Sequence, residues 1–322
     1  MADSANTGYG DIIVPAVFAD YVTLRTASLS AIAQSGIAAP VGQIQQAVQG
    51  GGDYANLPFW GDISGDSEVL PDGETADAAL TPGSISAAVQ VAVKQFRGKS
   101  WSTNDMAAMV AGSDPAMAIA NGVALYWMRD EQTRLIQILT GLFRTGGCLA
   151  ATHVLDVSGG GRKLNGEVVI EGAQLLGDHK DMLTAIAMHS AKHSSLQAQE
   201  LIEYVRDPAT NEISYTTYLG KRVIIDDGCP VTNGVYTTYL FGPGAIARAD
   251  VPVKVPVETQ RFALQGNDVL VSRQGLVLHP AGCSYASAVA GRNPTNAKLA
   301  TATSWTKVWE NKQIRLVAIL SR

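Results

Sequence analysis

The sequence has few cysteines, few charged residues and no surplus of basic charge, and each shortage argues against a class of protein. Its three cysteines, Cys148, Cys229 and Cys283, are widely spaced without a C-x-x-C pair, so we expect reduced thiols rather than a disulfide framework. Charged residues make up 16% of the chain, and its net charge is -5. Sequence-specific nucleic-acid-binding proteins usually carry a basic face, and neither a basic balance nor a basic stripe is present here.

Long hydrophobic runs are also missing. No stretch reaches the roughly 18 uninterrupted apolar residues of a membrane helix, and the first residues, MADSANTGYGDIIVP, lack the basic and apolar regions of a signal peptide. We therefore predict a soluble protein, made in the cytoplasm, with no membrane partner. The 322 residues are 46% hydrophobic, which is enough for a substantial core. Many small residues and few charges suit a protein that covers part of its surface with copies of itself.

Nucleotide-binding signatures are incomplete in this chain. Gly159 to Lys163 resembles a phosphate-binding loop in composition but lacks the G-x-x-x-x-G-K-[ST] spacing that lets backbone amides surround a phosphate. Gly242-Pro-Gly244 begins like a dinucleotide-binding turn but has no third glycine. No G-x-S-x-G nucleophile elbow is present.

Other candidate chemical sites have simpler structural explanations. His189 and His193 are four residues apart, as two metal ligands on a helix would be, but Ser190 follows the first histidine where a zinc protease has glutamate. We interpret them as packed or solvated side chains. Asp226-Asp227 could be an acid pair at a strand end, or part of a turn completed by Gly228, and the turn is the favoured interpretation. The acidic spacing after Asp62 resembles a calcium loop without its glycine and its bidentate glutamate. We predict no catalytic, cofactor-binding or metal-binding residue.

The most informative segment is an alternating run from Ser84 to Arg97. Ile85, Ala87, Val89, Val91 and Val93 share one side, and Ser86, Gln90 and Lys94 share the other, which predicts a strand. Fourteen residues would span about 46 Å, which is too long for a compact domain. We therefore expect it to pair with the strand-like run Asp53 to Trp60 and to form a projecting hairpin.

The turn region of this hairpin, Gly61 to Gly83, is acidic. It contains Asp62, Asp66, Glu68, Asp72, Glu74 and Asp77 and neither lysine nor arginine. It is either a solvated loop or an electrostatic contact with another subunit.

A long helix is predicted from Asp114 to Phe143. Asp114 is a suitable N-cap, Pro115 suits the first helical position, and Gly146-Gly147 is a stop signal. An apolar stripe runs from Leu125 to Leu142, and Arg129, Asp130, Glu131 and Arg134 form a charged face that includes an i,i+4 pair. At about 45 Å in length, this helix would be the spine of the fold.

The rest of the chain predicts a mixture of helices and strands. Residues 173–205 are expected to form two or three helices with breaks near Gly177 and His193 to Ser195. Strands are expected over residues 213–219, 221–225, 236–241, 251–258, 269–278 and 314–320. Pro252 and Pro256 reduce the fourth to an edge strand or an extended segment. The element order indicates an α+β fold.

Several phrases, in this order, resemble tailed-bacteriophage major capsid (coat) proteins of the Hong Kong 97-like fold, and the major capsid protein 13-like family in particular. They are DIIVPAVFADYV, LPFWGDISG, the run from AVKQFRGKSW to ILTGLF, GDHKDMLTAIAMHS, LGKRVIIDDGCPV and NPTNAKLATATSWTKVWENKQIRLVAIL. The resemblance implies an N-terminal arm at 1–50, an E-loop at 51–104, a P-domain with the spine helix at 105–170, an A-domain at about 171–275, and a return to the P-domain at 276–322.

The resemblance also implies a function and partners. The chain would be a structural protein that assembles into pentamers and hexamers of an icosahedral head enclosing double-stranded DNA, without sequence-specific binding. The virion would be its final location, after assembly in the host cytoplasm. The arm begins at Met1, so scaffolding would have to come from a separate protein or be unnecessary; a portal is a further expected partner. Lys94 and Lys99 lie at the hairpin base and the turn has no lysine, so we expect no covalent cross-link between subunits.

Contacts between subunits are expected along the E-loop. The candidate residues are Phe59, Trp60, Asp62, Asp66, Glu68, Ile85, Val89, Val91, Val93, Lys94 and Arg97. Two other functions remain open at this point. An encapsulin-like compartment shell would share the fold but enclose protein, and a cytosolic α+β enzyme would have an unrecognised site.

Overall fold

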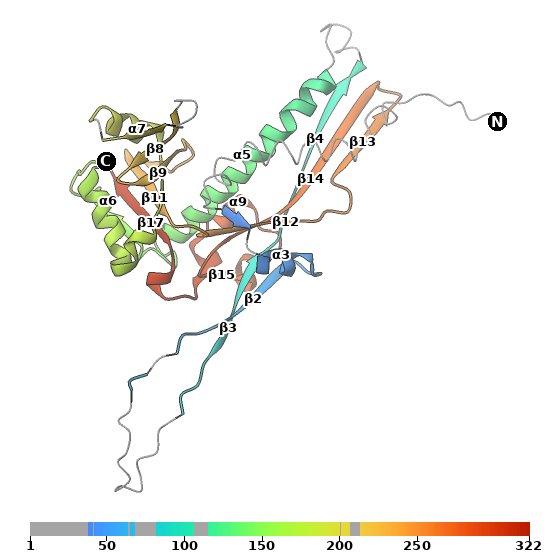
Figure 1. The fold of residues 1–322 in the computed structure, drawn as a ribbon. Helices are drawn as coiled ribbons and strands as arrows, with labels where there is room; N and C mark the ends of the chain where they lie inside the picture. Colours follow the sequence, from blue (N-terminus) through green and yellow to red (C-terminus); the bar gives the residue numbers. More distant parts are fainter. Residues whose placement is uncertain are drawn as a thin grey trace, which may run out of the picture.

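The computed structural model describes residues 38–40, 42–63, 65–67, 82–105, 115–199, 201–206 and 213–322 of the 322-residue chain. These residues form a lobe, an elongated layer and a hairpin that projects from the body (Figure 1). Most of the expected N-terminal arm, the hairpin tip with Glu68, and the helix-capping Asp114 lie outside the described residues.

The elongated layer is a sheet covered along its length by one helix. Its strand order is β1-β12-β14-β13, with β4 also paired to β14. The strands are β1 (Ala38–Pro40), β4 (Gln95–Asn104), β12 (Ile246–Val251), β13 (Val257–Phe262) and β14 (Asn267–Pro280). The helix is α5 (Pro115–Phe143), which begins and ends where the proline and the glycine pair predict, and which runs beside β4 and β14 in Figure 1.

The lobe is built on an eight-stranded sheet with the order β5-β17-β11-β6-β9-β8-β7, with β10 paired to β11. Its strands are β5 (Val154–Asp156), β6 (Ala185–Met188), β7 (Glu203–Arg206), β8 (Ile213–Tyr218), β9 (Lys221–Ile225), β10 (Val231–Thr232), β11 (Val235–Phe241) and β17 (Leu316–Ser321). Helix α6 (Gly166–Ala173), the 3-10 helix η2 (Gln174–Met182) and α7 (Ser190–Gln197) complete it.

The central strands of this sheet are buried on both faces. In β11, Tyr239 and Phe241 join the core shared with α5, whereas Leu240 joins the core under α6. The same alternation runs through β6 and β17. Two-sided burial explains why β6 and most of β17 read as continuous apolar runs rather than as alternating ones.

The remaining elements lie between the two sheets and at the hairpin base. They are α3 (Gly42–Gln49), β15 (Cys283–Tyr285), α8 (Ser287–Ala290), α9 (Asn296–Leu299), η3 (Ala302–Ser304), β16 (Trp305–Lys307) and η4 (Asn311–Gln313). Within the described residues, no helix is both long and apolar enough to cross a membrane.

Two expectations about secondary structure were wrong. The zone 173–205 contains strand β6 between helices, and α7 continues through His193 to Ser195. Most of the segment 251–258 is not a strand but the connection between β12 and β13, where Pro252 and Pro256 lie, as the alternative of an extended segment predicted. The domain boundaries at 170/171 and 275/276 stay a prediction, and they do not coincide with the sheet pairings. Strand β12 already belongs to the elongated sheet, and the C-terminal β17 lies inside the lobe.

Candidate assembly interface

The hairpin consists of β2 (Tyr54–Trp60) and β3 (Ala87–Val93), paired antiparallel from Tyr54 opposite Val93 to Trp60 opposite Ala87. The alternating segment is therefore not one fourteen-residue strand. It is interrupted at Lys94, whose backbone N–H donates to the Asp53 carbonyl at 3.0 Å, and it continues as β4 on a different sheet. The projecting arm exists, but the last three residues of the expected strand, Gln95 to Arg97, belong to β4 in the body.

The base of the hairpin is held firmly by its own subunit. The backbone N–H of Val91 donates to the hydroxyl of Ser284 at 3.0 Å. Gln90 is buried, with its Oε1 3.1 Å from Nε2 of His279 on β14. Farther along β2, next to Trp60, the ring of Phe59 meets Trp309 edge to face, at 6.2 Å between centroids. These contacts orient the hairpin from the body outward.

Two of the expected interface side chains lie inside the subunit instead. Val93 is 1% exposed and Lys94 is 3% exposed. The Lys94 ammonium donates to the Gly50 carbonyl at 2.5 Å. At the base of the hairpin, the polar side chains of the alternating segment therefore point into the subunit. Arg97 is likewise bound within its own chain, to Asn293 and the Pro294 carbonyl. We therefore remove Val93 and Lys94 from the candidate contact surface.

Farther from the body, the hairpin exposes large apolar side chains. Trp60 is 70% exposed, Val89 50% and Ile85 48%, whereas Val91 is half-buried. Ile63, which was not expected, is 83% exposed. It is the one large apolar residue between Gly61 and Gly65. An isolated apolar residue in a polar stretch was the sequence signal that could have predicted its exposure. A second uncovered apolar position, also missed, is Leu264 at the turn between β13 and β14.

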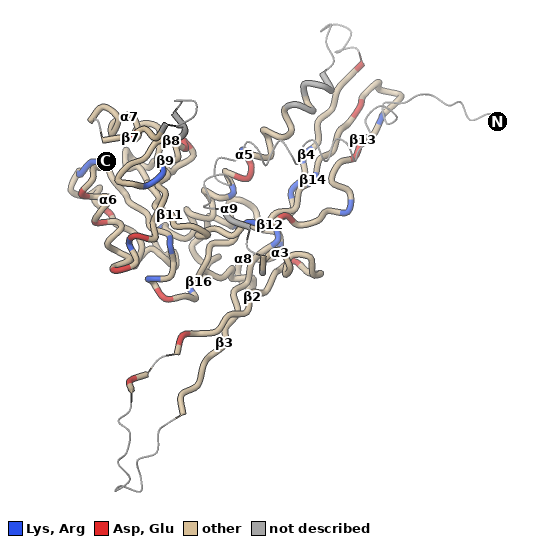
Figure 2. The backbone as a smooth tube through the Cα atoms, in the orientation of Figure 1, with Lys and Arg blue, Asp and Glu red and all other residues tan. Residues whose placement is uncertain are grey.

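Charge on the described part of the hairpin is of one sign. Asp62 and Asp66 are exposed, and residues 54–63, 65–67 and 82–93 carry no other charged side chain. Figure 2 shows this as acidic positions on the hairpin without basic ones, in contrast to the mixed signs of the body.

One ion pair and one hydrogen bond from a buried arginine join the spine helix to the elongated sheet. Glu131 accepts two hydrogen bonds from Arg248 of β12, at 2.7 and 3.2 Å. Burial alone would lower the pKa of Arg248, but the hydrogen bonds and charge of Glu131 raise it. Arg134 has no exposed side-chain surface; it contacts Asp130 at 2.9 Å and Gln274 at 3.0 Å, and burial lowers its pKa. The expected i,i+4 pair is confirmed, but two members of the charged face, Glu131 and Arg134, are buried, whereas Arg129 is exposed.

Three of the candidate catalytic or metal-binding residues have structural partners, whereas Nε2 of His193 is buried without a hydrogen-bond partner. His189 caps α7 by accepting from the backbone N–H of Ala191 at 3.1 Å. Asp226 accepts from the N–H of Gly228 at 2.8 Å, which closes the expected turn. Asp227 accepts from the N–H of Ser190 at 3.1 Å, and the hydrogen bonds from Ser190 lower its pKa.

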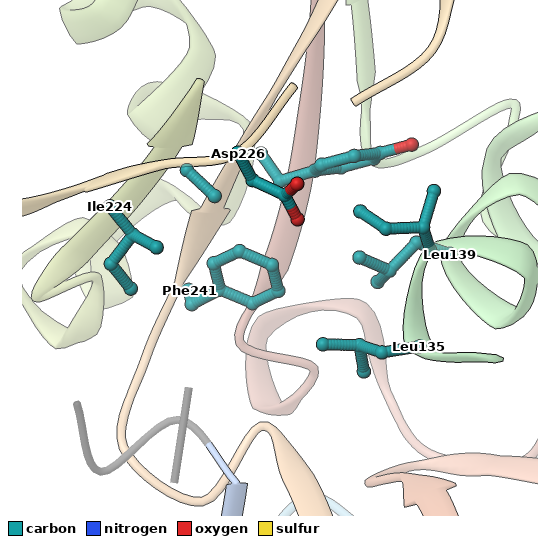
Figure 3. Close-up of a pocket in the computed structure, with 8 residues that line it drawn as sticks. Leu135, Leu139, Ile224, Asp226 and Phe241 are labelled. Carbon is teal, nitrogen blue, oxygen red and sulfur yellow. The ribbon is translucent and has the colours of Figure 1, made fainter. Parts of the chain in front are cut away.

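A small cavity lies between α5 and the lobe sheet. Leu135 and Leu139 line it from the helix, and Ile224, Asp226 and Phe241 from the sheet side (Figure 3). Its volume of about 10 Å³ is at the lower limit for one water molecule, and its walls are almost entirely apolar. It is a packing defect beside the spine and has no room for a substrate.

Comparison with known proteins assigns this architecture. The family model "Major capsid protein 13-like" matches residues 38–314. The chain is 41% identical over 327 residues to the major capsid protein of Bacillus phage SPP1, covering 99% of both chains. The chain belongs to the major capsid protein 13-like family.

Solved structures share the fold of this capsid protein at low sequence identity. The capsid of Ralstonia phage GP4 matches with a TM-score of 0.56 and 9% identity, covering 90% of this chain and 88% of the other. The Cyanophage Pam1 capsid matches with a TM-score of 0.55 and 11% identity, covering 92% and 91%. The Hong Kong 97-like α+β fold and a structural role in the capsid shell of a tailed bacteriophage are thus confirmed, in preference to a compartment shell or an enzyme.

Proposed function

We propose that copies of this capsid protein form pentamers and hexamers in which each hairpin lies across a neighbouring subunit. The exposure of Trp60, Ile63 and Val89 on a two-stranded hairpin carries this proposal. An isolated hairpin is marginal in water, and covering apolar surface stabilises an assembly by roughly 25 cal/mol per Å². Closed symmetry repeats each such contact around the shell.

The parts of the fold suggest a division of roles. The eight-stranded lobe would be the A-domain at the centre of each capsomer, and α5 with the elongated sheet would be the P-domain. Residues 1–50 would be the arm that reaches other subunits. In this division the A-domain takes in the C-terminal strand β17 and gives up the segment from β12 onward, as the sheet pairings suggest.

The acidic hairpin suggests a partner surface of opposite charge. Asp62 and Asp66, together with Glu68, would meet basic side chains of another subunit. Lys94 is buried with its ammonium on the Gly50 carbonyl, and this supports shells held without a lysine cross-link. The net charge of -5 suits a wall that encloses double-stranded DNA without gripping its phosphates. Assembly would take place in the host cytoplasm with a separate scaffolding protein and a portal.

Replacing Trp60 tests the hairpin contact. We expect Trp60→Ser to reduce the yield of closed particles at least tenfold, because the most exposed ring of the two hairpin strands loses its cover on the neighbour. The melting temperature of the unassembled subunit should not change, since the ring is 70% exposed there. Sedimentation velocity and negative-stain microscopy measure particle yield.

The matched control is Ala87→Ser, which alters the residue paired with Trp60 while removing almost no apolar surface. It should assemble like the parent protein. Normal particle yield from Trp60→Ser would refute the proposed contact, whereas loss from both variants would point to the hairpin backbone instead.

A further inference from the structure

Two of the three cysteines meet at the junction of the spine helix and the C-terminal segment. Cys148 lies just after α5, and Cys283 is the first residue of β15. Their Sγ atoms are 4.0 Å apart, although the residues are 135 positions apart in the chain. Cys283 is fully buried and Cys148 is half-buried. The fold therefore pairs one accessible thiol with one enclosed thiol.

The backbone on both sides of this pair is closely fixed. A side chain at Gly147 would approach the Leu142 carbonyl oxygen to 2.3 Å, and one at Gly282 would approach Ile314 to 2.7 Å. Gly282 also has a positive φ of 84°, and its carbonyl accepts from the N–H groups of Val308 and Trp309. Each cysteine thus follows a glycine that the packing requires, so the approach of the two thiols is set by the fold.

We propose that Cys148 and Cys283 form an intrachain disulfide once the assembled particle leaves the reducing cytoplasm. The two sulfurs must close from 4.0 Å to about 2.05 Å, and the half-buried Cys148 side chain has the freedom to move. This modification site is independent of the proposed hairpin contact, because both thiols belong to one subunit.

The surroundings distinguish the roles of the two thiols. The hydrogen bond between the two thiols lowers the pKa of Cys148, and Lys307 acts in the same direction. The shared hydrogen bond and burial raise the pKa of Cys283. Cys148 is therefore the thiolate that reacts first, since the thiolate is the nucleophile in disulfide exchange.

The oxidant is a small-molecule disulfide of the glutathione type. The Cys148 thiolate attacks one sulfur of that disulfide, breaks its S–S bond and releases one small thiolate. Cys283 then loses its proton to solvent and attacks Cys148 Sγ, which releases the second small thiol. Two electrons pass from the cysteine pair to the small disulfide, and the chain gains one S–S bond.

The bond would join the end of the spine helix to the β15–β16 pair. A cross-link that closes a long segment restricts the unfolded chain strongly. Oxidised protein should therefore melt on the order of 5 °C above reduced protein.

The test compares full-length protein, in particles, after incubation with oxidised glutathione or with dithiothreitol. After denaturation and alkylation without reductant, we expect the thiol count to fall from three to one. A tryptic digest should then contain peptide 145–162 joined to peptide 274–292. Reduced protein should show neither change. If no particles form, the same measurements on the unassembled chain still decide this proposal.

Cys229→Ser and Cys148→Ser form the matched pair of variants. Cys229 is buried, and burial with the nearby Asp226 and Asp227 raises its pKa to about 12, so Cys229→Ser should keep the joined peptides and the melting shift. Cys148→Ser should lose both. Three free thiols after oxidation, a persistent mixed disulfide at Cys148, or a ladder of disulfide-linked chains on a non-reducing gel would each overturn the proposal.

Discussion

The hairpin β2–β3 and the central strands β6, β11 and β17 are both rich in small and apolar residues, but they bury them differently. In the central strands, successive side chains enter the core under α5 and the core under α6. In the hairpin, Ala92 and Val93 at the base are buried, whereas Trp60 and Ala87 at the far end are exposed. The subunit buries the central strands by itself but leaves the far end of the hairpin exposed.

This difference shows that hydrophobic content alone does not reveal where the burial takes place. A strand that carries its own cover contributes to the stability of the isolated chain. A strand that lacks it can contribute only after another molecule covers it. Substitutions in the two regions should therefore separate subunit stability from assembly.

The largest effect is expected for Leu240→Ala in β11. Leu240 has no exposed surface and packs in the core under α6. Its truncation removes transfer energy and leaves a cavity, so the free energy of unfolding should fall by about 2–5 kcal/mol. Urea denaturation of the unassembled subunit measures this change. An effect below about 1 kcal/mol would mean that the lobe, like the hairpin, depends on neighbours for its cover.

The sequence predicted best where a local signal and the final structure agree. Pro115 and the Gly146-Gly147 pair predicted the limits of α5, because chain stiffness and flexibility act locally. The run Lys221 to Ile225 became β9 with the expected limits. The hairpin was predicted from alternation and excessive length, and the family from phrases along the whole chain.

Predictions failed where a distant partner decides the outcome. Residues 185–188 become a strand only because β9 and β11 pair with them on either side, and a four-residue apolar run does not distinguish strand from helix. Glu131 and Arg134 look like surface charges in the sequence. They are buried because Arg248 and Gln274 come from strands more than a hundred residues away.

A second prediction concerns pH at the hairpin base. His279, which contacts Gln90 of β3, is fully enclosed, and burial lowers its pKa from 6.5 to about 4. Between pH 6.5 and 4 the unfolded chain binds this proton and the folded chain does not, so stability is lost as pH falls through that range. The loss should be on the order of 3 kcal/mol.

The control for that prediction is His279→Gln, in which the group no longer titrates. Burial also lowers the pKa of His153, and its contribution remains in both proteins. The free energy of unfolding, measured by urea titration at several pH values, should decline less steeply for the variant. Parallel pH profiles would show that His279 is accessible to water and that the hairpin base is looser than the rest of the body.

The smallest effect on subunit stability is expected for a valine on β3. The same strand also allows the most direct comparison of a buried position with an exposed one. Val93 is 1% exposed and Val89 is 50% exposed on β3, so the same substitution can be made on both sides of the boundary. Val93→Ala should lower the free energy of unfolding by about 1–2 kcal/mol, whereas Val89→Ala should change it by less than about 0.5 kcal/mol.

For assembly, Val89→Ala should have the larger effect of the two substitutions, because only the Val89 side chain remains for a neighbour to cover. Urea denaturation and particle yield, measured on the same two proteins, test whether the two substitutions have opposite orders of effect on stability and on assembly. Equal effects on both quantities would place the boundary between subunit and neighbour elsewhere on the hairpin.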